Sequence, residues 1–156
     1  MCDQFIEVKK QHYIFYSIFM ALFEKHLVIK KSKIPGAGKG LFTKTFIPKG
    51  TRIIEYKGRI TTWKNVLEGK IFNGYVYYIN RNYVIDAMRR KTALARYAND
   101  ANGLTKSELV NNSKYVVDNK RVFLQAKKDI EVGEEILVSY GNEYWKVISE
   151  YKKTLE

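Results

Sequence analysis

Four short segments, in one order along the chain, hold the residues best suited to ligand binding and chemistry. They are Gly-Ala-Gly-Lys-Gly-Leu-Phe at 36–42, Glu-Tyr-Lys-Gly at 55–58, Arg-Tyr-Ala-Asn-Asp at 96–100 and Glu-Ile-Leu-Val-Ser-Tyr-Gly at 135–141. Glycines like those of the first segment let a backbone approach a ligand closely and adopt positive φ angles. Each segment alone is also explained by ordinary turn chemistry. The complete ordered series, within one domain's length, is much harder to explain in that way.

Tyrosine is unusually frequent, with twelve residues in a chain of 156. Tyrosine rings can wall a channel while their hydroxyls offer hydrogen bonds. This composition suits a narrow site for a long, cationic side chain. A biased base composition of the coding sequence would produce the same excess, so both explanations stay open.

The charge balance is strongly basic: Lys and Arg total 28 against 16 Asp and Glu, a net charge of +12. Such a balance favours polyanions, namely nucleic acid, chromatin or acidic lipid surfaces. A solvated, lysine-rich surface explains it equally well. The local basic clusters, at 30–33 and 89–91, are too short to be called nucleic-acid motifs.

Cys2 is the single cysteine of the chain. Neither a disulfide within the chain nor a cysteine-based zinc site can be built from it, so no metal site is predicted. This cysteine usage favours a reducing, intracellular location.

An apolar run of about ten residues at 14–23 is too short to span a bilayer, which takes roughly twenty residues. No small-residue cleavage site follows it, as a signal peptide would require. We predict a mostly buried amphipathic helix over 5–25, added to the front of the domain, and no transmembrane span. An uncleaved export or membrane-surface segment is the alternative.

From residue 27 onward the pattern predicts short strands separated by turns. A loop rich in Asn, Ser, Gly and Asp is expected over 100–113. The chain therefore reads as a mainly β domain of several small sheets with short helices. The predicted strands are 27–30, 38–44, 51–56, 75–79, 83–87, 114–118, 121–126 and 136–138; the predicted helices are 63–68, a helical turn at 92–97, and 142–156.

The four segments together resemble the SET-domain protein lysine methyltransferases, over about residues 27–145. The resemblance implies a compact, zinc-free SET domain whose C-terminal segment is threaded beneath the preceding loop. It divides the chain into an N-terminal helical extension (1–26), the SET domain (27–141) and a helical segment that closes the cofactor site (142–156).

The resemblance also implies S-adenosylmethionine as the cofactor. Asn99 maps to the asparagine that holds the cofactor's amino group, and Trp145 to an aromatic that stacks on the adenine, although core packing explains Trp145 nearly as well. Tyr77 and Tyr78 match aromatics that flank the channel, with ordinary sheet packing as the alternative for at least one. The full set of predicted cofactor-binding residues is Gly36, Gly38, Lys39, Gly40, Tyr78, Arg96, Asn99, Asp100 and Trp145.

One departure from the family pattern falls on this site. The family has His followed by Ser-Cys where this chain has Asp100, Ala101 and Asn102. If that His acts through its backbone, Asp can replace it; if its side chain is required, cofactor binding weakens. Asn111 or Asn112 is expected to stand for the asparagine that closes the motif.

Three tyrosines are the predicted catalytic residues: Tyr140, Tyr56 and Tyr115. By the resemblance, Tyr140 and Tyr56 belong to the channel for the target lysine, while Tyr115 compensates for the small Val138. This combination favours mono- or dimethylation. No histidine falls in the motifs, so we expect desolvation, rather than a side-chain base, to lower the pKa of the target amine.

The predicted function is methylation of protein lysines, with histones or other basic proteins as candidate substrates and chromatin or nucleic acid as a candidate contact. A basic tail would gain from a locally acidic groove, which Glu134, Glu135, Asp100, Asp118 and Glu143 could supply. Two alternatives remain: a SET-like binding module without catalysis, and a basic nucleic-acid-binding β domain. The oligomeric state is not predicted.

Overall fold

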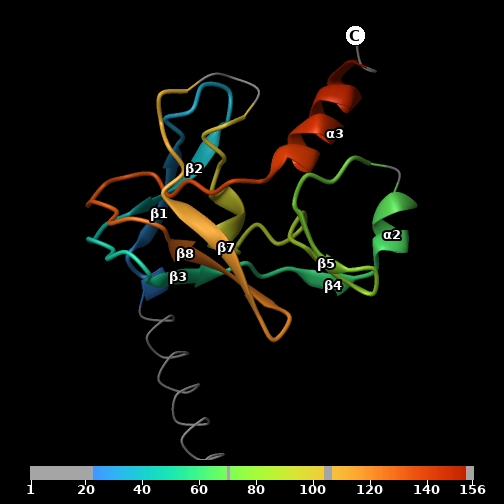
Figure 1. The fold of residues 1–156 in the computed structure, drawn as a ribbon, viewed down its shortest axis with the longest axis horizontal. Coiled ribbons are helices and arrows are strands. Elements are labelled where there is room, and N and C mark those ends of the chain that lie inside the picture. Colours follow the sequence, from blue (N-terminus) through green and yellow to red (C-terminus); the bar gives the residue numbers. More distant parts are fainter. Residues whose placement is uncertain (1–22, 70, 104–106, 154–156) are drawn as a thin grey trace, which may run out of the picture.

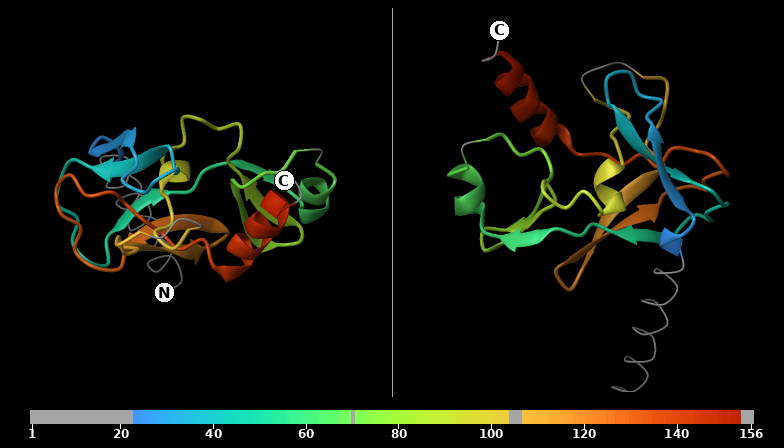
Figure 2. Two further views of the ribbon diagram at one scale, coloured as in Figure 1. Left: turned by 90° about the horizontal axis from the view of Figure 1, so that it is seen from above. Right: turned by 180° about the vertical axis from the view of Figure 1, so that it is seen from behind.

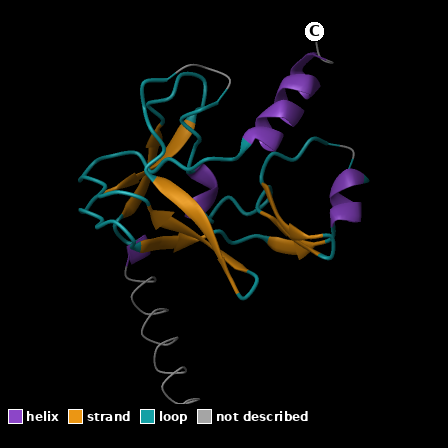
Figure 3. Ribbon diagram, viewed as in Figure 1, coloured by secondary structure: helices purple, strands orange, loops and turns teal. Residues whose placement is uncertain are grey.

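A computed structural model describes residues 23–69, 71–103 and 107–153. These residues form three small antiparallel sheets joined by loops and short helices (Figures 1 and 3). The mainly β fold class predicted from the sequence is confirmed. Most of the predicted helix at 5–25 lies outside the described residues.

The first sheet pairs β1 (Leu27–Lys31) with β2 (Lys39–Thr43), so that Lys31 lies opposite Lys39. The loop between them turns through two glycines with positive φ, Gly36 (77°) and Gly38 (73°). Glycine adopts this conformation without the steric cost that a Cβ brings. The glycine-rich segment is thus a turn whose backbone conformation requires glycine at two positions.

The second sheet has the strand order β3–β8–β7, with β3 (Arg52–Glu55), β7 (Ser113–Asp118) and β8 (Arg121–Ala126). The β7–β8 hairpin turns through Asn119 (φ 47°) and Lys120 (φ 63°). Two consecutive residues with positive φ are typical of a hairpin turn whose twist matches its strands. Lys120 is an unusual residue for this conformation, and its ammonium group lies 5.5 Å from the centroid of the Tyr83 ring.

The third sheet has the order β4–β6–β5, with β4 (Arg59–Thr61), β5 (Val76–Asn80) and β6 (Tyr83–Asp86). Helix α2 (Trp63–Leu67) follows β4, and the hydroxyl of its N-cap, Thr62, accepts a hydrogen bond from the backbone of Asn65. This sheet and α2 lie at the opposite end of the molecule from β1 and β2 (Figures 1 and 2). The sequence did not predict β4, whose three residues are too few to show an alternating pattern.

Two further helices flank the site described below: the 3₁₀ helix η1 (Leu94–Tyr97) and α3 (Asn142–Lys153). Both were predicted, apart from their exact ends. Helix α3 extends away from the sheets toward the C-terminus (Figure 1). No described helix is long and apolar enough to cross a bilayer.

Residues 135–140, which we call the crossing segment, run between parts of the chain that are distant in sequence. The predicted strand at 136–138 forms only isolated bridges, because each neighbour is met for a single residue. Its backbone hydrogen bonds join Ile136 N to Leu41 O (2.7 Å), Val138 N to Asn99 O (2.8 Å) and Ser113 N to Leu137 O (2.9 Å). The crossing segment therefore brings the second half of the domain against residue 99.

The hydrophobic core lies where the first two sheets, η1 and the crossing segment meet. Burying a Leu or Ile side chain completely stabilises a fold by about 1.5–3 kcal/mol. The largest apolar side chains that are completely buried are Leu41, Ile47, Ile53, Ile54, Leu124, Ile130 and Ile136. This core fixes the segments that carry the candidate site.

Candidate functional site

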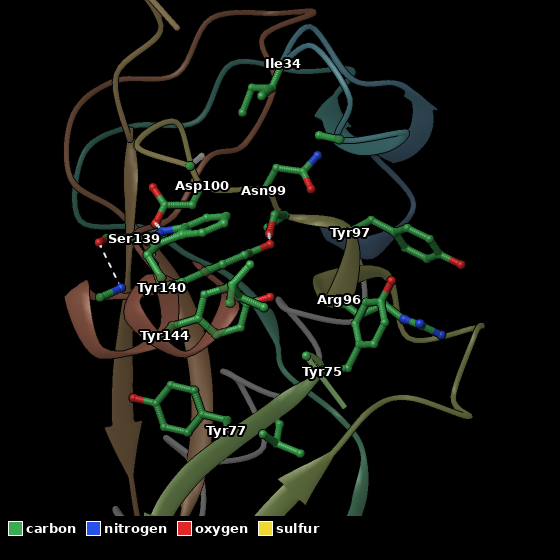
Figure 4. Close-up of a pocket in the computed structure, with 18 of the residues that line it drawn as sticks. Ile34, Tyr75, Tyr77, Arg96, Tyr97, Asn99, Asp100, Ser139, Tyr140 and Tyr144 are labelled. Atoms are coloured by element: carbon green, nitrogen blue, oxygen red, sulfur yellow. Dashed lines mark hydrogen bonds between the residues drawn. The ribbon is translucent and has the colours of Figure 1, made fainter. Parts of the chain in front are cut away.

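A pocket of about 880 Å³ opens between the β1–β2 loop, η1, the start of β5 and the beginning of α3 (Figure 4). In this view Asn99, Asp100 and Tyr140 lie together, and Tyr144 lies between Tyr140 and Tyr77. The lining is dominated by tyrosine rings at one end and by the polar groups of Asn99 and Asp100 at the other. Tyr56, Tyr75, Tyr77, Tyr97, Tyr115, Tyr140 and Tyr144 all line it.

Three tyrosines, two on or directly after strands of the second sheet and one on the third, meet at the aromatic end. The ring of Tyr115 on β7 lies 4.9 Å from that of Tyr77 on β5 and 5.9 Å from that of Tyr56, which follows β3. The rings meet edge to face or tilted, as aromatic quadrupoles favour. Three chain segments far apart in sequence thus contribute one wall of rings.

The tyrosine hydroxyls are held by backbone carbonyls. Tyr140 Oη donates to Ala98 O at 2.7 Å, and Tyr56 Oη donates to Tyr75 O at 3.0 Å. Because a phenol has one proton and two lone pairs, each oxygen remains able to accept a hydrogen bond from an N–H group. The geometry suits recognition of an amine.

Removal from water raises the pKa of both hydroxyls above the ordinary value for tyrosine, and neighbouring tyrosines add to the effect at Tyr140. Burial likewise raises the pKa of Tyr115. A phenol with a raised pKa is neutral at physiological pH. These tyrosines therefore act as neutral hydrogen-bonding groups, and none is a base at neutral pH.

Asn99 lies at the polar end of the pocket. Its side-chain amide donates to Lys39 O at 3.0 Å and to Glu135 Oε1 at 3.1 Å. Among the described residues no group donates to Asn99 Oδ1. The amide nitrogen is thus used in positioning the side chain, and its oxygen can accept a hydrogen bond from a ligand.

Glu135 explains why Gly40 is a glycine. The Glu135 carboxylate is 3% exposed and accepts hydrogen bonds from Ser32 Oγ (2.7 Å), Lys33 N (2.7 Å) and Asn99 Nδ2. A Cβ at position 40 would overlap Glu135 Oε1. Gly40 therefore provides space for a buried carboxylate that holds both Asn99 and the glycine-rich loop.

Asp100 is also buried, at 3% exposure, and its carboxylate accepts hydrogen bonds from the loop after it and from the start of the C-terminal region. Trp145 Nε1 donates one of these hydrogen bonds, at 2.8 Å, and Tyr140 N donates another, at 2.7 Å. The Trp145 ring stacks on that of Tyr140, with centroids 5.7 Å apart and planes 16° apart. Trp145 thereby becomes part of the pocket wall.

Arg96 packs its guanidinium over the ring of Tyr75, 4.0 Å from the centroid, and 5.4 Å from that of Tyr97. Its Nε and Nη1 are buried, and within the described residues they have no hydrogen-bond partner. Cation–π contact with two rings offsets part of the cost of that burial. The arginine places a positive charge beside the pocket.

Most of the predicted site residues line this one pocket, while three do not. Gly38 and Gly40 lie outside the lining and act on the loop itself, through backbone conformation and through space for Glu135. Tyr78 is 52% exposed and packs on Trp63, with ring centroids 5.3 Å apart. The predicted residues in the lining are Gly36, Lys39, Tyr56, Arg96, Asn99, Asp100, Tyr115, Tyr140 and Trp145.

Strand geometry explains the position of Tyr78. Successive side chains of a strand point to opposite faces, so Tyr77 and Tyr78 on β5 cannot both face the pocket. Tyr77 is the one that lines it. Tyr75 and Tyr144 also line the pocket and were not predicted as site residues. The only signals in the sequence were the place of Tyr75 at the start of a predicted strand and that of Tyr144 next to Trp145.

The sequence pattern of the SET domain family matches residues 38–141. The chain belongs to the SET domain family. The match begins within the glycine-rich turn and ends at the last residue of the fourth segment, so it contains Asn99, Asp100 and Tyr140.

Relatives of this SET domain carry methyltransferase names. It is 30% identical over 127 residues to the N-lysine methyltransferase KMT5A of Xenopus tropicalis. The matched region covers 73% of this chain and 36% of that protein. It is 30% identical over 120 residues to the histone-lysine N-methyltransferase set-17 of Caenorhabditis elegans, covering 74% and 41%. The chain spans less than half the length of these two relatives.

Proposed function

We propose that this SET domain transfers a methyl group from S-adenosylmethionine to lysine side chains of proteins. The observation that carries the proposal is the convergence of Asn99 and Tyr140 on one tyrosine-lined pocket, although they are separated by 41 positions (140 − 99) in the chain. Family membership and the names of the relatives support the same activity.

The described residues fit this cofactor. Asn99 Oδ1 can accept from an ammonium group, the Trp145 ring can stack on a base, and the turn at Gly36 and Lys39 exposes backbone at the pocket wall. A pocket of about 880 Å³ lies in the range of sites that hold molecules of this size. When bound, S-adenosylmethionine supplies a methyl group on a positively charged sulfur.

The chain's own contribution is to hold the target amine neutral and aligned. A free lysine has a pKa of about 10.4, so only about one in a thousand is neutral near pH 7. A site walled by Tyr56, Tyr115 and Tyr140 removes the ammonium group from water, which lowers its pKa and favours loss of its proton to water. Because these phenols stay protonated, they receive no proton from the substrate.

The same tyrosines orient the amine. With their own protons donated to carbonyls, Tyr140 Oη and Tyr56 Oη can each accept from the amine N–H groups. Positioning of reacting groups can contribute up to roughly 7–11 kcal/mol to a rate. Mono- or dimethylation is the proposed product range, because the Tyr115 ring lies at the aromatic wall while Val138 is completely buried.

The observed geometry bears on one alternative, a SET-like module that has lost catalysis. That alternative rested on Asp100 standing where the family has His. In the structure Asp100 ties Trp145 and Tyr140 to the pocket, so the substitution retains a formed site. We therefore propose the active enzyme. Histones are a candidate substrate class because relatives carry that name, and contact with nucleic acid is a further proposal from the net charge of +12.

The test is a methyl-transfer assay on a panel of histones and non-histone proteins, with labelled S-adenosylmethionine. Mass spectrometry of labelled proteins should find methyl groups on lysine and show one or two per site. Calorimetric titration with S-adenosylhomocysteine checks the cofactor pocket independently of the substrate. Labelling of arginine instead of lysine, or absence of both binding and transfer, would overturn the proposal.

A further inference from the structure

The Asp100 carboxylate is the most highly connected side chain of the site. It accepts four hydrogen bonds, and both oxygens are used. Oδ1 accepts from Asn102 N (2.9 Å) and Asn111 Nδ2 (2.8 Å), while Oδ2 accepts from Tyr140 N (2.7 Å) and Trp145 Nε1 (2.8 Å).

These four donors belong to two separate parts of the chain. Asn102 and Asn111 lie at the two ends of the loop that follows Asp100, and Ala101 N donates in turn to Asn111 Oδ1 at 2.9 Å. Tyr140 and Trp145 lie on either side of the start of α3. A single ionised carboxylate can serve this many donors because it has about four lone-pair positions, whereas a neutral imidazole accepts only one bond.

Several aromatic side chains of helix α3 contact the rest of the domain. Tyr144 Oη lies against Gly74, and the ring of Tyr151 stacks on Phe72 with centroids 4.8 Å apart. The Trp145 ring lies over Gly103, where an added Cβ would come within 3.1 Å of it. The Trp145–Asp100 bond adds a charge-assisted, directional contact, which is stronger than a bond between neutral groups.

We infer that Asp100 is a positioning residue that holds Trp145 as a wall of the cofactor pocket and fixes the backbone at Tyr140. The inference rests on the proposed function only for the identity of the ligand. In Figure 4 Asp100 lies beside Tyr140, at the end of the pocket where Asn99 is also found. Asp100 itself contacts no reacting atom, because all its acceptor positions serve the protein.

The test compares Asp100→Asn with Glu143→Gln, a matched carboxylate-to-amide change on the exposed first turn of α3. Both are made in a Trp63→Phe background. Trp145 is then the single tryptophan of the chain, so the fluorescence reports on it alone. Two properties are measured: the fluorescence emission of Trp145 in the free protein, and the Kd for S-adenosylhomocysteine by calorimetry.

Asp100→Asn should shift the emission of Trp145 to longer wavelength and weaken S-adenosylhomocysteine binding by at least about tenfold, the size expected for a hydrogen bond to a charged group. Glu143→Gln should change neither. Trp145→Phe removes the same hydrogen bond by deleting its donor, so it should also raise the Kd for S-adenosylhomocysteine. Adding Asp100→Asn to Trp145→Phe should then raise the Kd much less than Asp100→Asn does in the parent, because the shared contact is already absent.

The inference would be overturned if Asp100→Asn left the emission wavelength unchanged and the Kd within twofold of the parent value. It would also be overturned if the effects of the two substitutions on the Kd were fully additive. If Asp100→Asn does not fold, the Kd of Trp145→Phe decides alone, and an unchanged value overturns the inference. A parent that does not bind S-adenosylhomocysteine would instead contradict the proposed function. The emission of Trp145 would still show whether Asp100 positions it.

Discussion

Two buried carboxylates organise the polar end of the pocket, and each is satisfied by different means. Glu135 accepts from a hydroxyl, a backbone amide and the Asn99 side chain, while Asp100 accepts from two backbone amides, an indole and an amide side chain. A buried charge is tolerated when its hydrogen bonds replace those lost from water. Both acids therefore act inside the fold and are not available to a substrate.

The space around Glu135 gives a prediction for Gly40→Ala. A Cβ at this position would overlap the carboxylate, which is held by three donors and cannot move without losing them. The cost combines overpacking with a broken buried network, about 3 kcal/mol or more in the free energy of unfolding. Urea denaturation measures it.

Gly50→Ala is the control for Gly40→Ala, because Gly50 has a positive φ of 86° but no atom within 4 Å of an added Cβ. Its cost should be the conformational one alone, about 1–2 kcal/mol. Equal losses at the two positions would mean that the overlap with Glu135 does not determine the choice of glycine.

Tyr140→Phe tests the proposed catalytic role of Tyr140. The substitution removes the hydroxyl that donates to Ala98 O but keeps the ring that stacks on Trp145. Misplacing a reacting group by about 1 Å can cost about a hundredfold in rate. We expect kcat to fall by at least about that factor while the Kd for S-adenosylhomocysteine changes little. Equal losses in rate and in affinity would show that Tyr140 serves the cofactor and not the amine.

At the scale of elements, one buried side-chain amide supplements the backbone hydrogen bonds that hold the crossing segment. Asn112 Nδ2 donates to Glu135 O at 2.8 Å, and Asn112 Oδ1 accepts from Leu137 N at 2.9 Å. The side chain thus completes the hydrogen bonding of a segment that has no continuous strand partner. This is the position for which the sequence offered either Asn111 or Asn112; the structure uses both, Asn111 toward Asp100 and Asn112 toward the crossing segment.

Asn112→Ala should therefore destabilise the domain strongly. It leaves a buried carbonyl and a buried N–H without partners, at about 1–3 kcal/mol for each. Gln125→Ala is the control, since that amide makes one exposed bond, to Gly50 O. Chemical denaturation should show a loss of about 2–6 kcal/mol for Asn112→Ala and less than about 1 kcal/mol for the control. Similar small losses for both would mean that the crossing segment does not depend on this amide.

Local sequence patterns predicted the elements that make their own hydrogen bonds. The strands flanking clear turns, helix α2 and helix α3 were all found, apart from their exact ends. The crossing segment was not described correctly, because its structure depends on partners distant in sequence. Strand β4 was missed because its three residues are too few to show an alternating pattern. The sequence located Asn99 and Tyr140 through their motifs. It could not show which face of β5 carries the pocket tyrosine, because that depends on segments distant in sequence.

For the whole molecule, the buried tyrosines predict sensitivity to alkali. Burial raises the pKa of Tyr56, Tyr115 and Tyr140 above the unfolded value of about 10. Above about pH 10 the unfolded chain releases these protons while the folded protein retains them, so stability present below that pH is lost as the pH rises. The urea midpoint should fall steeply above pH 10, and Tyr56→Phe should reduce the slope. Tyrosinate absorbance from these residues in the folded protein at pH 10 would contradict the assignment.

The distribution of charge over the molecule bears on the choice of substrate. An acidic groove was expected from five residues, but Asp100 and Glu135 are buried and Asp118 pairs with Arg52 at 2.9 Å. Lys39 and Arg96, both positive, line the pocket. With a net charge of +12, the protein should repel a strongly basic tail at low salt.

If the enzyme acts as proposed, a target lysine with acidic neighbours should have a lower KM than the same lysine with basic neighbours. Attraction between exposed charges weakens as salt shortens the screening length, from about 30 Å at 0.01 M to about 10 Å at 0.1 M. The difference in KM should therefore shrink several-fold over that range. The kcat should stay nearly constant, because the flanking charges affect the association of the peptide with the enzyme and not the transfer step. Measuring both constants for matched peptides at the two salt concentrations decides the point. A lower KM for the basic peptide at low salt would mean that Glu134, Glu143 or another acidic group forms a groove strong enough to overcome the net charge.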